Sequence, residues 1–240
     1  MTIKSLLFLL LVLIGAYASV KMRKLTAMGA LAGTVLAIFI FLGTGFNGIA
    51  MIGLFFLLGT LATAWKRKVK EAIDVYGDER GGRTAGQVIA NGGVAGILGL
   101  LAWIFPQELS TWRLMMAAAL ASATADTLSS EIGTVYGRKF YCIPSFKPGQ
   151  RGANGSISIE GTVVGIAGSM VIAIVYSIPG GWDQSFALVV VAGTLGNLVD
   201  SFLGANFENK GWLSNNAVNL ANTISAALAA LILKKLHLLS

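Results

Sequence analysis

Two aspartates lie in apolar segments of a chain that carries few charges, and they are its best candidates for chemistry. Asp126 follows the run "RLMMAAALASA" and Asp200 lies within "GTLGNLVDSFLGANFE", while charged residues make up only 12% of the chain. An ionisable group at membrane depth is costly and by default marks a functional or ion site. A hard cation such as Mg²⁺ prefers oxygen ligands, keeps several waters, and uses one or two carboxylates plus substrate phosphates. The two aspartates therefore predict a Mg²⁺ site.

Three glutamates accompany this pair. Glu131 and Glu208 follow the two aspartates closely, and Glu160 opens another apolar segment, "SISIEGTVVGIAG". The glycines around Asp200 are also typical of a helix-packing seam, which would account for the glycines but not for the carboxylate. We therefore retain the cation site as the interpretation of both aspartates.

The segment "GRKFYCIPSFKPGQRGANGS" supplies the opposite charge through Arg138, Lys139, Lys147 and Arg151. Its glycines allow backbone amides to approach an anion. Positive-inside topology alone also produces basic loops, so this loop gains meaning only beside the carboxylates. Together they indicate phosphoryl transfer, in which catalysis is mostly positioning and charge neutralisation. The absence of a G-x-x-x-x-G-K-[ST] sequence excludes a P-loop enzyme. The single cysteine excludes multi-cysteine metal sites, and the position of the single histidine near the C-terminus argues against histidine-centred catalysis.

The elements that must position these residues are membrane helices. The chain has 55% hydrophobic residues and a mean hydropathy of +0.74, above the average soluble domain. A spanning helix needs about 20 mostly apolar residues, and such segments occur at 4–20, 26–45, 48–65, 87–105, 112–130, 159–178, 184–204 and 216–234. We expect an all-α polytopic bundle of about eight helices forming one integral membrane domain, 1–240, without strands. The first segment also resembles a signal peptide, but the spans that follow favour a membrane helix.

The basic residues predict the orientation of the bundle. If the first helix starts outside, fourteen of the 18 Lys and Arg residues fall in inner loops, at 21–24, 66–83, 138–151 and 210. Positive residues are concentrated on the cytoplasmic side of membrane proteins. We therefore expect both termini outside and the site on the cytoplasmic side of the cell (inner) membrane or its organellar equivalent.

Five ordered segments resemble a known family over nearly the whole chain: "GRTAGQVIANGG", "ADTLSSEIG", "GQRGANGSISIEG", "DSFLGANFE" and "NNAVNLANT". The chain is similar to the multi-span membrane family that includes the plant and cyanobacterial phytyl-phosphate kinases of tocopherol biosynthesis. A looser similarity reaches polyprenol kinases and CDP-diacylglycerol synthases. This resemblance implies an enzyme that uses CTP, or another nucleoside triphosphate, with Mg²⁺ and an isoprenoid lipid phosphate. The other expected partner is membrane lipid, and no nucleic acid is expected. The resemblance is also compatible with an oligomer.

The resemblance also implies roles for individual residues. Asp126 and Asp200 would be metal ligands, with Glu131 and Glu160 supporting the metal or ordering the loop. The basic residues of the loop would hold the triphosphate, and Lys147 would join the two aspartates as a catalytic group. Nucleotide or lipid phosphate would be oriented by four asparagines, which are Asn91, Asn154, Asn215 and Asn216.

The residue types available favour a lipid phosphate as the acceptor over a lipid alcohol, which would need a general base. A phosphate monoester is largely dianionic at neutral pH because its second pKa is about 6, so it needs charge neutralisation more than a general base. The prediction is a CTP-dependent prenyl phosphate kinase, acting on phytyl or geranylgeranyl phosphate and producing the diphosphate. Two alternatives remain. One is a cytidylyltransferase, in which the lipid phosphate attacks the α-phosphate of CTP. The other, from another class, is a lipid or ion transporter that carries cations on the aspartates.

Overall fold

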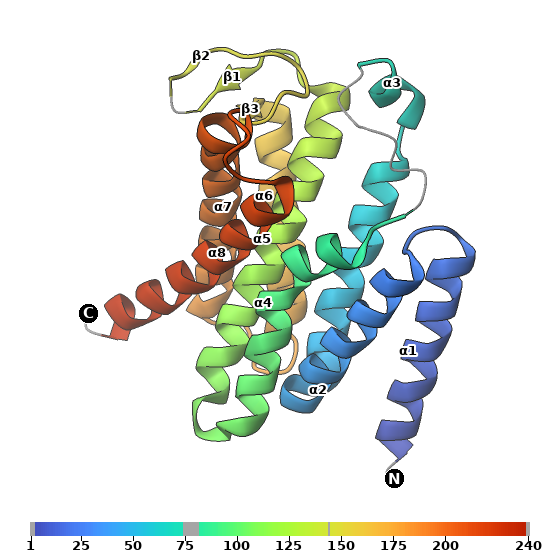
Figure 1. Ribbon diagram of the computed structural model, residues 1–240. Helices are drawn as coiled ribbons and strands as arrows, with labels where there is room; N and C mark the ends of the chain where they lie inside the picture. Colours follow the sequence, from blue (N-terminus) through green and yellow to red (C-terminus); the bar gives the residue numbers. More distant parts are fainter. Residues whose placement is uncertain (1–2, 74–81, 144, 239–240) are drawn as a thin grey trace.

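The protein is a bundle of α-helices, and one end of the bundle carries a small group of strands (Figure 1). The computed structural model describes residues 3–73, 82–143 and 145–238. Within them the α-helices are α1 (Ile3–Lys21), α2 (Ala27–Ala64), α3 (Arg67–Glu71), α4 (Ala85–Ile104), α5 (Leu109–Tyr136), α6 (Ile159–Ser177), α7 (Gln184–Leu203) and α8 (Asn215–Leu238). A short 3-10 turn (Pro106–Glu108) precedes α5, and a π-helical turn (Gly204–Glu208) follows α7. The predicted all-α bundle is confirmed.

The long helix α2 is a hairpin of two spans. Its backbone is non-helical at Gly45, where φ is 61°, a left-handed conformation that glycine adopts without steric cost. Both ends of α2 lie near Arg83: the Thr26 amide donates to the Arg83 carbonyl over 3.1 Å, and Gly59 lies beside the Arg83 guanidinium. The two predicted spans 26–45 and 48–65 are therefore present, joined at Gly45.

The helix α5 is the centre of the bundle. Every residue from Leu114 to Ala125 is buried, which covers more than three helical turns, and α5 contacts α2, α4, α6, α7 and α8. Close approach to α6 requires glycine, because a Cβ on Gly161 would lie 2.7 Å from the Ser129 carbonyl oxygen. The sequence predicted a helix ending at 130, whereas α5 continues to Tyr136. Its last turns are stabilised by packing against neighbouring helices rather than by an apolar composition.

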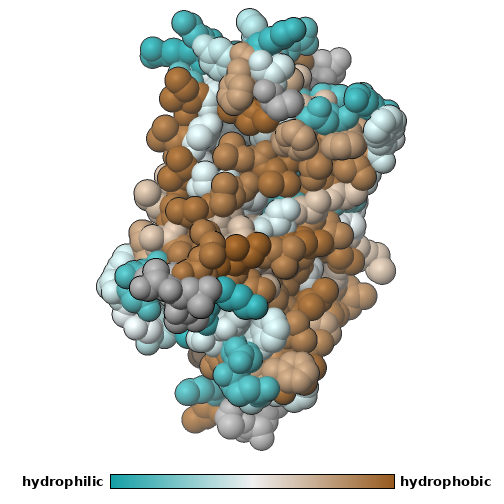
Figure 2. Space-filling view, turned by 90° about the vertical axis from the view of Figure 1, so that its left-hand side faces the viewer, coloured by the Kyte–Doolittle hydropathy of each residue, from teal (hydrophilic) through white to brown (hydrophobic). Residues whose placement is uncertain are grey.

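The surface has the polarity of a membrane protein. Among the described residues, six helices are long and apolar enough to cross a membrane: α1, α2, α4, α6, α7 with its π-helical turn, and α8. Figure 2 shows a hydrophobic surface over the middle of the molecule, with hydrophilic residues gathered toward its ends. A helix surrounded by other helices, such as α5, need not itself be strongly apolar, because it presents little surface to lipid.

The loop between α5 and α6 contains a small sheet, which the sequence analysis did not expect. Strands β1 (Tyr141–Cys142), β2 (Lys147–Pro148) and β3 (Ser156–Ile157) form an antiparallel sheet in the order β2-β1-β3. Strands were considered unfavourable because open sheet edges cannot be satisfied in hydrocarbon. This sheet lies beyond the helix ends, at the top of the bundle in Figure 1, where that restriction does not apply.

Candidate functional site

A polar cavity of about 650 Å³ opens at the end of the bundle where the sheet lies. Its walls come from the end of α2, from α4, α5, α6, α7 and α8, and from the π-helical turn and the loop containing β3. Carboxylate, amide and hydroxyl side chains dominate the lining, including Asp126, Ser129, Ser130, Asn197, Asp200 and Glu208. Such a concentration of polar groups between apolar helices needs a polar occupant.

The two aspartates meet in this cavity. Asp126 projects from α5 and Asp200 from α7, and both carboxyl groups are close enough to interact with each other directly. Glu208, in the π-helical turn, lies within electrostatic range of both. Asp126 precedes the end of α5 by ten residues, or about 15 Å along the helix axis. Asp126 is therefore recessed into the bundle, deeper than it would be in a helix that ended at residue 130, as the predicted span 112–130 did.

Buried amides hold Asp200 in place. The Asn222 side chain of α8 donates to Asp200 Oδ2 over 3.4 Å, and its Oδ1 accepts a hydrogen bond from the Ser122 hydroxyl of α5. Asn222 is only 1% exposed, so these partners satisfy polar groups that water does not reach. A second link joins α5 to α7, where the Ser129 hydroxyl donates to Asn197 Oδ1 over 3.3 Å.

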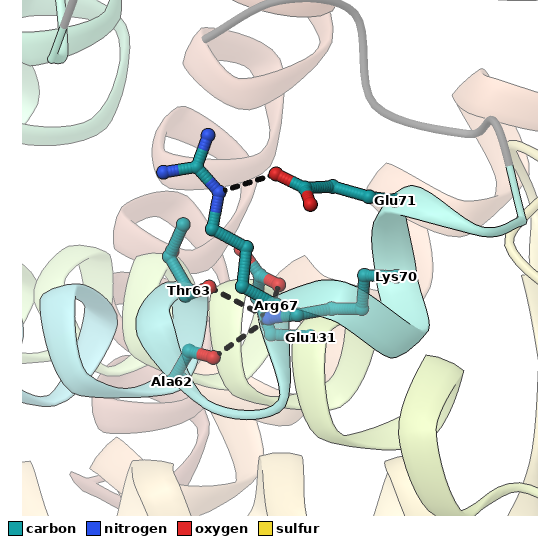
Figure 3. A network of polar contacts seen from close by, with 6 residues as sticks. All are labelled: Ala62, Thr63, Arg67, Lys70, Glu71 and Glu131. Carbon is teal, nitrogen blue, oxygen red and sulfur yellow. Dashed lines mark hydrogen bonds and ion pairs between the residues drawn. The ribbon is translucent and has the colours of Figure 1, made fainter. Parts of the chain in front are cut away.

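Glu131 is held differently, in a buried ion pair. Lys70 of α3 donates to Glu131 Oε2 over 2.5 Å and to the carbonyls of Ala62 and Thr63, each over 2.8 Å (Figure 3). Lys70 is 3% and Glu131 8% exposed. All three ammonium protons have acceptors, two of which are carbonyls at the C-terminal end of α2, where cations are favoured. The pair fixes one wall of the cavity, which both Thr63 and Glu131 line.

Three helices begin at the cavity. Thr84 caps α4 in a reciprocal capping box with Gln87, Ser158 caps α6 by accepting from the Gly161 amide, and α8 starts at Asn215. These residues line the cavity. Helix N-termini carry partial positive charge and unpaired amides that favour anions. The cavity thus combines carboxylates with several positive helix ends.

The predicted residues divide into two groups. The cavity is lined by seven of them: Asp126, Asp200, Glu131, Asn91, Asn154, Asn215 and Asn216. The others lie outside its lining. Glu160 lies 4.0 Å from the largely exposed Arg138, and Arg151 donates to the Val135 carbonyl over 2.7 Å. Lys139 and Lys147 are exposed in the loop, with Lys147 in β2.

Comparison with known proteins gives the family. The model of the family described as "Integral membrane protein DUF92" matches residues 10–227 of the chain. The chain belongs to this family. It is 32% identical over 218 residues to Protein VTE6, chloroplastic, of Arabidopsis thaliana. The alignment covers 88% of this chain and 66% of the relative, so the chain spans slightly less than two thirds of that protein's length. No solved structure matches the chain significantly.

Two further relatives of the family come from microbes. An uncharacterized membrane protein of Methanocaldococcus jannaschii is 32% identical over 208 residues, covering 85% of this chain and 83% of the relative. An uncharacterized membrane protein of Synechocystis is 29% identical over 223 residues, covering 90% and 85%. The resemblance found in the sequence is therefore confirmed at the level of the family, and the chain is an integral membrane protein.

The donor set fits a hard cation in one restricted way. Within residues 3–73, 82–143 and 145–238, no three His, Cys, Asp or Glu side chains form a cluster suited to a metal. The four predicted ligands thus do not converge, since Glu131 pairs with Lys70 and Glu160 with Arg138. Asp126 and Asp200 do meet, and two carboxylates with waters and substrate oxygens suit Mg²⁺.

The sequence analysis missed several polar residues of the site. Asn197, Asn222 and Arg83 were assigned no role, yet Asn197 and Arg83 line the cavity and Asn222 contacts Asp200. Helical spacing could have found two of them. Asn197 precedes Asp200 by three residues, and Asn222 follows Asn215 by seven, so each shares a helix face with a recognised residue.

Proposed function

We propose that this protein transfers the γ-phosphoryl group of CTP, or of another nucleoside triphosphate, to an isoprenoid monophosphate. The products are the isoprenoid diphosphate and the nucleoside diphosphate. The observation that supports the proposal is the meeting of Asp126 and Asp200 in a polar cavity onto which α4, α6 and α8 open their N-termini. Carboxylates suit a divalent cation and helix N-termini suit phosphate oxygens. A nucleotide–metal complex carries both kinds of group.

Asp126 and Asp200 are the residues that would hold Mg²⁺. When bound, Mg²⁺ neutralises phosphate oxygens and orients them for transfer. Asn222 orients the Asp200 carboxylate through its amide, as partners of metal ligands commonly do. Glu131 is already neutralised by Lys70, so its role is to shape the wall of the cavity and not to bind the cation.

Phosphate oxygens are recognised by amides and one nearby guanidinium. Asn154, Asn215 and Asn216 present side-chain amides to the cavity, and Arg83 reaches it from the segment that precedes α4. Guanidinium groups match phosphate geometry through paired N–H donors. The acceptor, a dianionic phosphate monoester, attacks without help from a strong base, which agrees with a site built from carboxylates, amides and hydroxyls.

The basic loop acts from outside the cavity lining. Arg138, Lys139 and Lys147 are exposed, and a group of like charges at a cavity mouth raises the local concentration of a polyanion. Arg151 anchors the loop to the end of α5 by its hydrogen bond to Val135. We assign the loop to capture of the triphosphate on the cytoplasmic side.

The assignment is tested with purified protein, Mg²⁺, CTP and a panel of prenyl monophosphates, with the products separated by chromatography. Release of CDP with a prenyl diphosphate supports the kinase, whereas pyrophosphate with a CDP-lipid identifies a cytidylyltransferase. Absence of nucleotide turnover with every acceptor contradicts an enzyme and favours a transporter.

Two variants test the assignment of the aspartates. Asp126→Asn and Asp200→Asn should each lower turnover by about 100-fold or more, the usual effect of removing a central electrostatic group. Asp183→Asn is the matched control, because Asp183 caps α7 at the opposite end of the bundle and asparagine caps equally well. Full activity of either cavity variant at saturating Mg²⁺ contradicts the metal-ligand role.

A further inference from the structure

An apolar groove of about 260 Å³ lies between α1, α2 and α4 and adjoins the polar cavity. Its walls are aliphatic and aromatic, with Leu11, Val12, Leu36, Ile49, Ile52 and Phe55 among them. The outer wall is α1, whose side chains are mostly exposed and of which Phe8 alone is buried among the described residues. The groove therefore lies where α1 is only loosely covered by the rest of the bundle.

Glycines keep this groove open. Gly15 of α1 and Gly53 of α2 line it, and a Cβ added to either would meet no atom within 4 Å. A Cβ on Gly33, which also lines it, would meet only Val88, at 3.9 Å. Glycines in membrane helices usually allow helices to approach closely, as Gly161 does against α5. These three do not serve close packing, and their effect is to leave space unfilled.

The groove and the cavity share a polar boundary. Arg83, Gln87 and Asn91 line both. The Arg83 guanidinium lies 5.8 Å from the centre of the Phe55 ring, and its Nη2 would be 2.8 Å from a Cβ on Gly59. A molecule that extended from the groove into the cavity would thus pass from apolar walls to a cation just before α4 and to two amides in the first two turns of α4.

We propose that the groove holds the hydrocarbon tail of an isoprenoid monophosphate whose phosphate lies beside Arg83, facing Asp126 and Asp200. This inference rests on the proposed function, because it assigns a place to the acceptor of that reaction. The groove and its boundary match the two parts of such a lipid. The apolar walls suit the tail, and the Arg83 guanidinium, where the groove meets the polar cavity, suits the phosphate. A free phosphate would use Arg83 but not the groove, and a neutral lipid would use the groove but not Arg83.

The geometry gives a test by chain length. Gly53 precedes Gly59 by six residues, about 9 Å along the helix, so a side chain at Gly53 obstructs the tail away from the phosphate. Gly53→Leu and Gly15→Leu should raise KM for a 20-carbon prenyl phosphate by about tenfold and leave KM for CTP and for a five-carbon prenyl phosphate unchanged. Ala167→Leu is the control, because it places the same leucine side chain at an exposed position of α6. An equal rise in KM for the 20-carbon and the five-carbon acceptor, or no rise for either, overturns the proposal.

A second measurement separates this inference from the proposed reaction. A 20-carbon prenyl phosphate with a photoreactive diazirine at the end of its tail is irradiated with the purified protein, and the labelled peptides are sequenced. Labelling of the groove residues in α1, α2 and α4 supports the groove even where no nucleotide is consumed, in which case only the kinase assignment fails. Labelling at other helices, or no labelling, contradicts the assignment of the tail to the groove, whether or not the kinase assay succeeds.

Discussion

The buried pair Lys70–Glu131 offers the sharpest test of how the cavity is built. Lys70→Met removes an ammonium group that has three acceptors, and it leaves Glu131 almost fully buried beside the other carboxylates. Breaking one side of a buried ion pair costs about 3–5 kcal/mol. For a chain of this size, each kcal/mol shifts Tm by about 2–4 °C, so we expect Tm to fall by about 6–20 °C.

The same helix provides an internal control. Arg67 and Glu71 also form an ion pair over 2.7 Å, but their side chains are 55% and 56% exposed (Figure 3). Exposed pairs one helical turn apart contribute only about 0.3–0.5 kcal/mol. Arg67→Ala should therefore change Tm by about 2 °C or less, although the two pairs look alike in geometry.

The assay is thermal unfolding of the purified protein in detergent, followed by circular dichroism, for the two single variants and the double variant of the buried pair. Glu131→Gln should cost less than Lys70→Met, because Lys70 keeps its two carbonyls. Lys70→Met combined with Glu131→Gln should be more stable than the sum of the single effects predicts, by about 1–3 kcal/mol, since no charge stays unpaired. Additive effects, or a Lys70→Met shift no larger than that of Arg67→Ala, would refute the reasoning.

Further predictions concern the site and the packing around it. Asn222→Ala should raise the Mg²⁺ concentration for half-maximal activity by about 10–100-fold with little change at saturation, because Asp200 loses its orienting amide; an unchanged Mg²⁺ titration contradicts this. Gly196→Ala should destabilise by about 1–3 kcal/mol in thermal unfolding, because its Cβ would lie 2.9 Å from the Asn222 carbonyl oxygen. Gly53→Ala, which meets open space, should instead stabilise by up to about 1 kcal/mol; the two glycines behaving alike would argue against the packing described. Raising the ionic strength should increase KM for CTP, because exposed charges are screened beyond about 8–10 Å at physiological salt, and Arg138→Ala should weaken that dependence.

Hydropathy and length sufficed to predict the helices, because every span must satisfy its backbone internally and cover its surface with apolar groups. The prediction was least accurate for α5, whose end was placed six residues early. A helix enclosed by five others is stabilised by contacts with residues distant in sequence, and a window of hydropathy does not contain those contacts.

The site was predicted in part, and the success follows the type of residue. Asp126 and Asp200 were found because a carboxylate in an apolar segment is conspicuous in any sequence. The role of Lys70 was not found, since it lies in a loop already rich in basic residues. Its partner Glu131 is 61 positions away, and only the folded chain shows that this lysine is buried while Arg67, three residues earlier, is exposed.

The alternation of the spans explains why opposite charges can share one cavity. Because successive spans run in opposite directions, α4, α6 and α8 begin at the end where the sheet lies, and α5 and α7 finish there. Their N-termini carry partial positive charge, which favours anions. The carboxylates are carried instead by α5 and α7, as side chains set in from the helix ends, with the π-helical turn adding Glu208. An odd number of spans inserted between α4 and α8 would reverse this polarity, so the connectivity of the bundle itself separates the positions for a cation from those for phosphate.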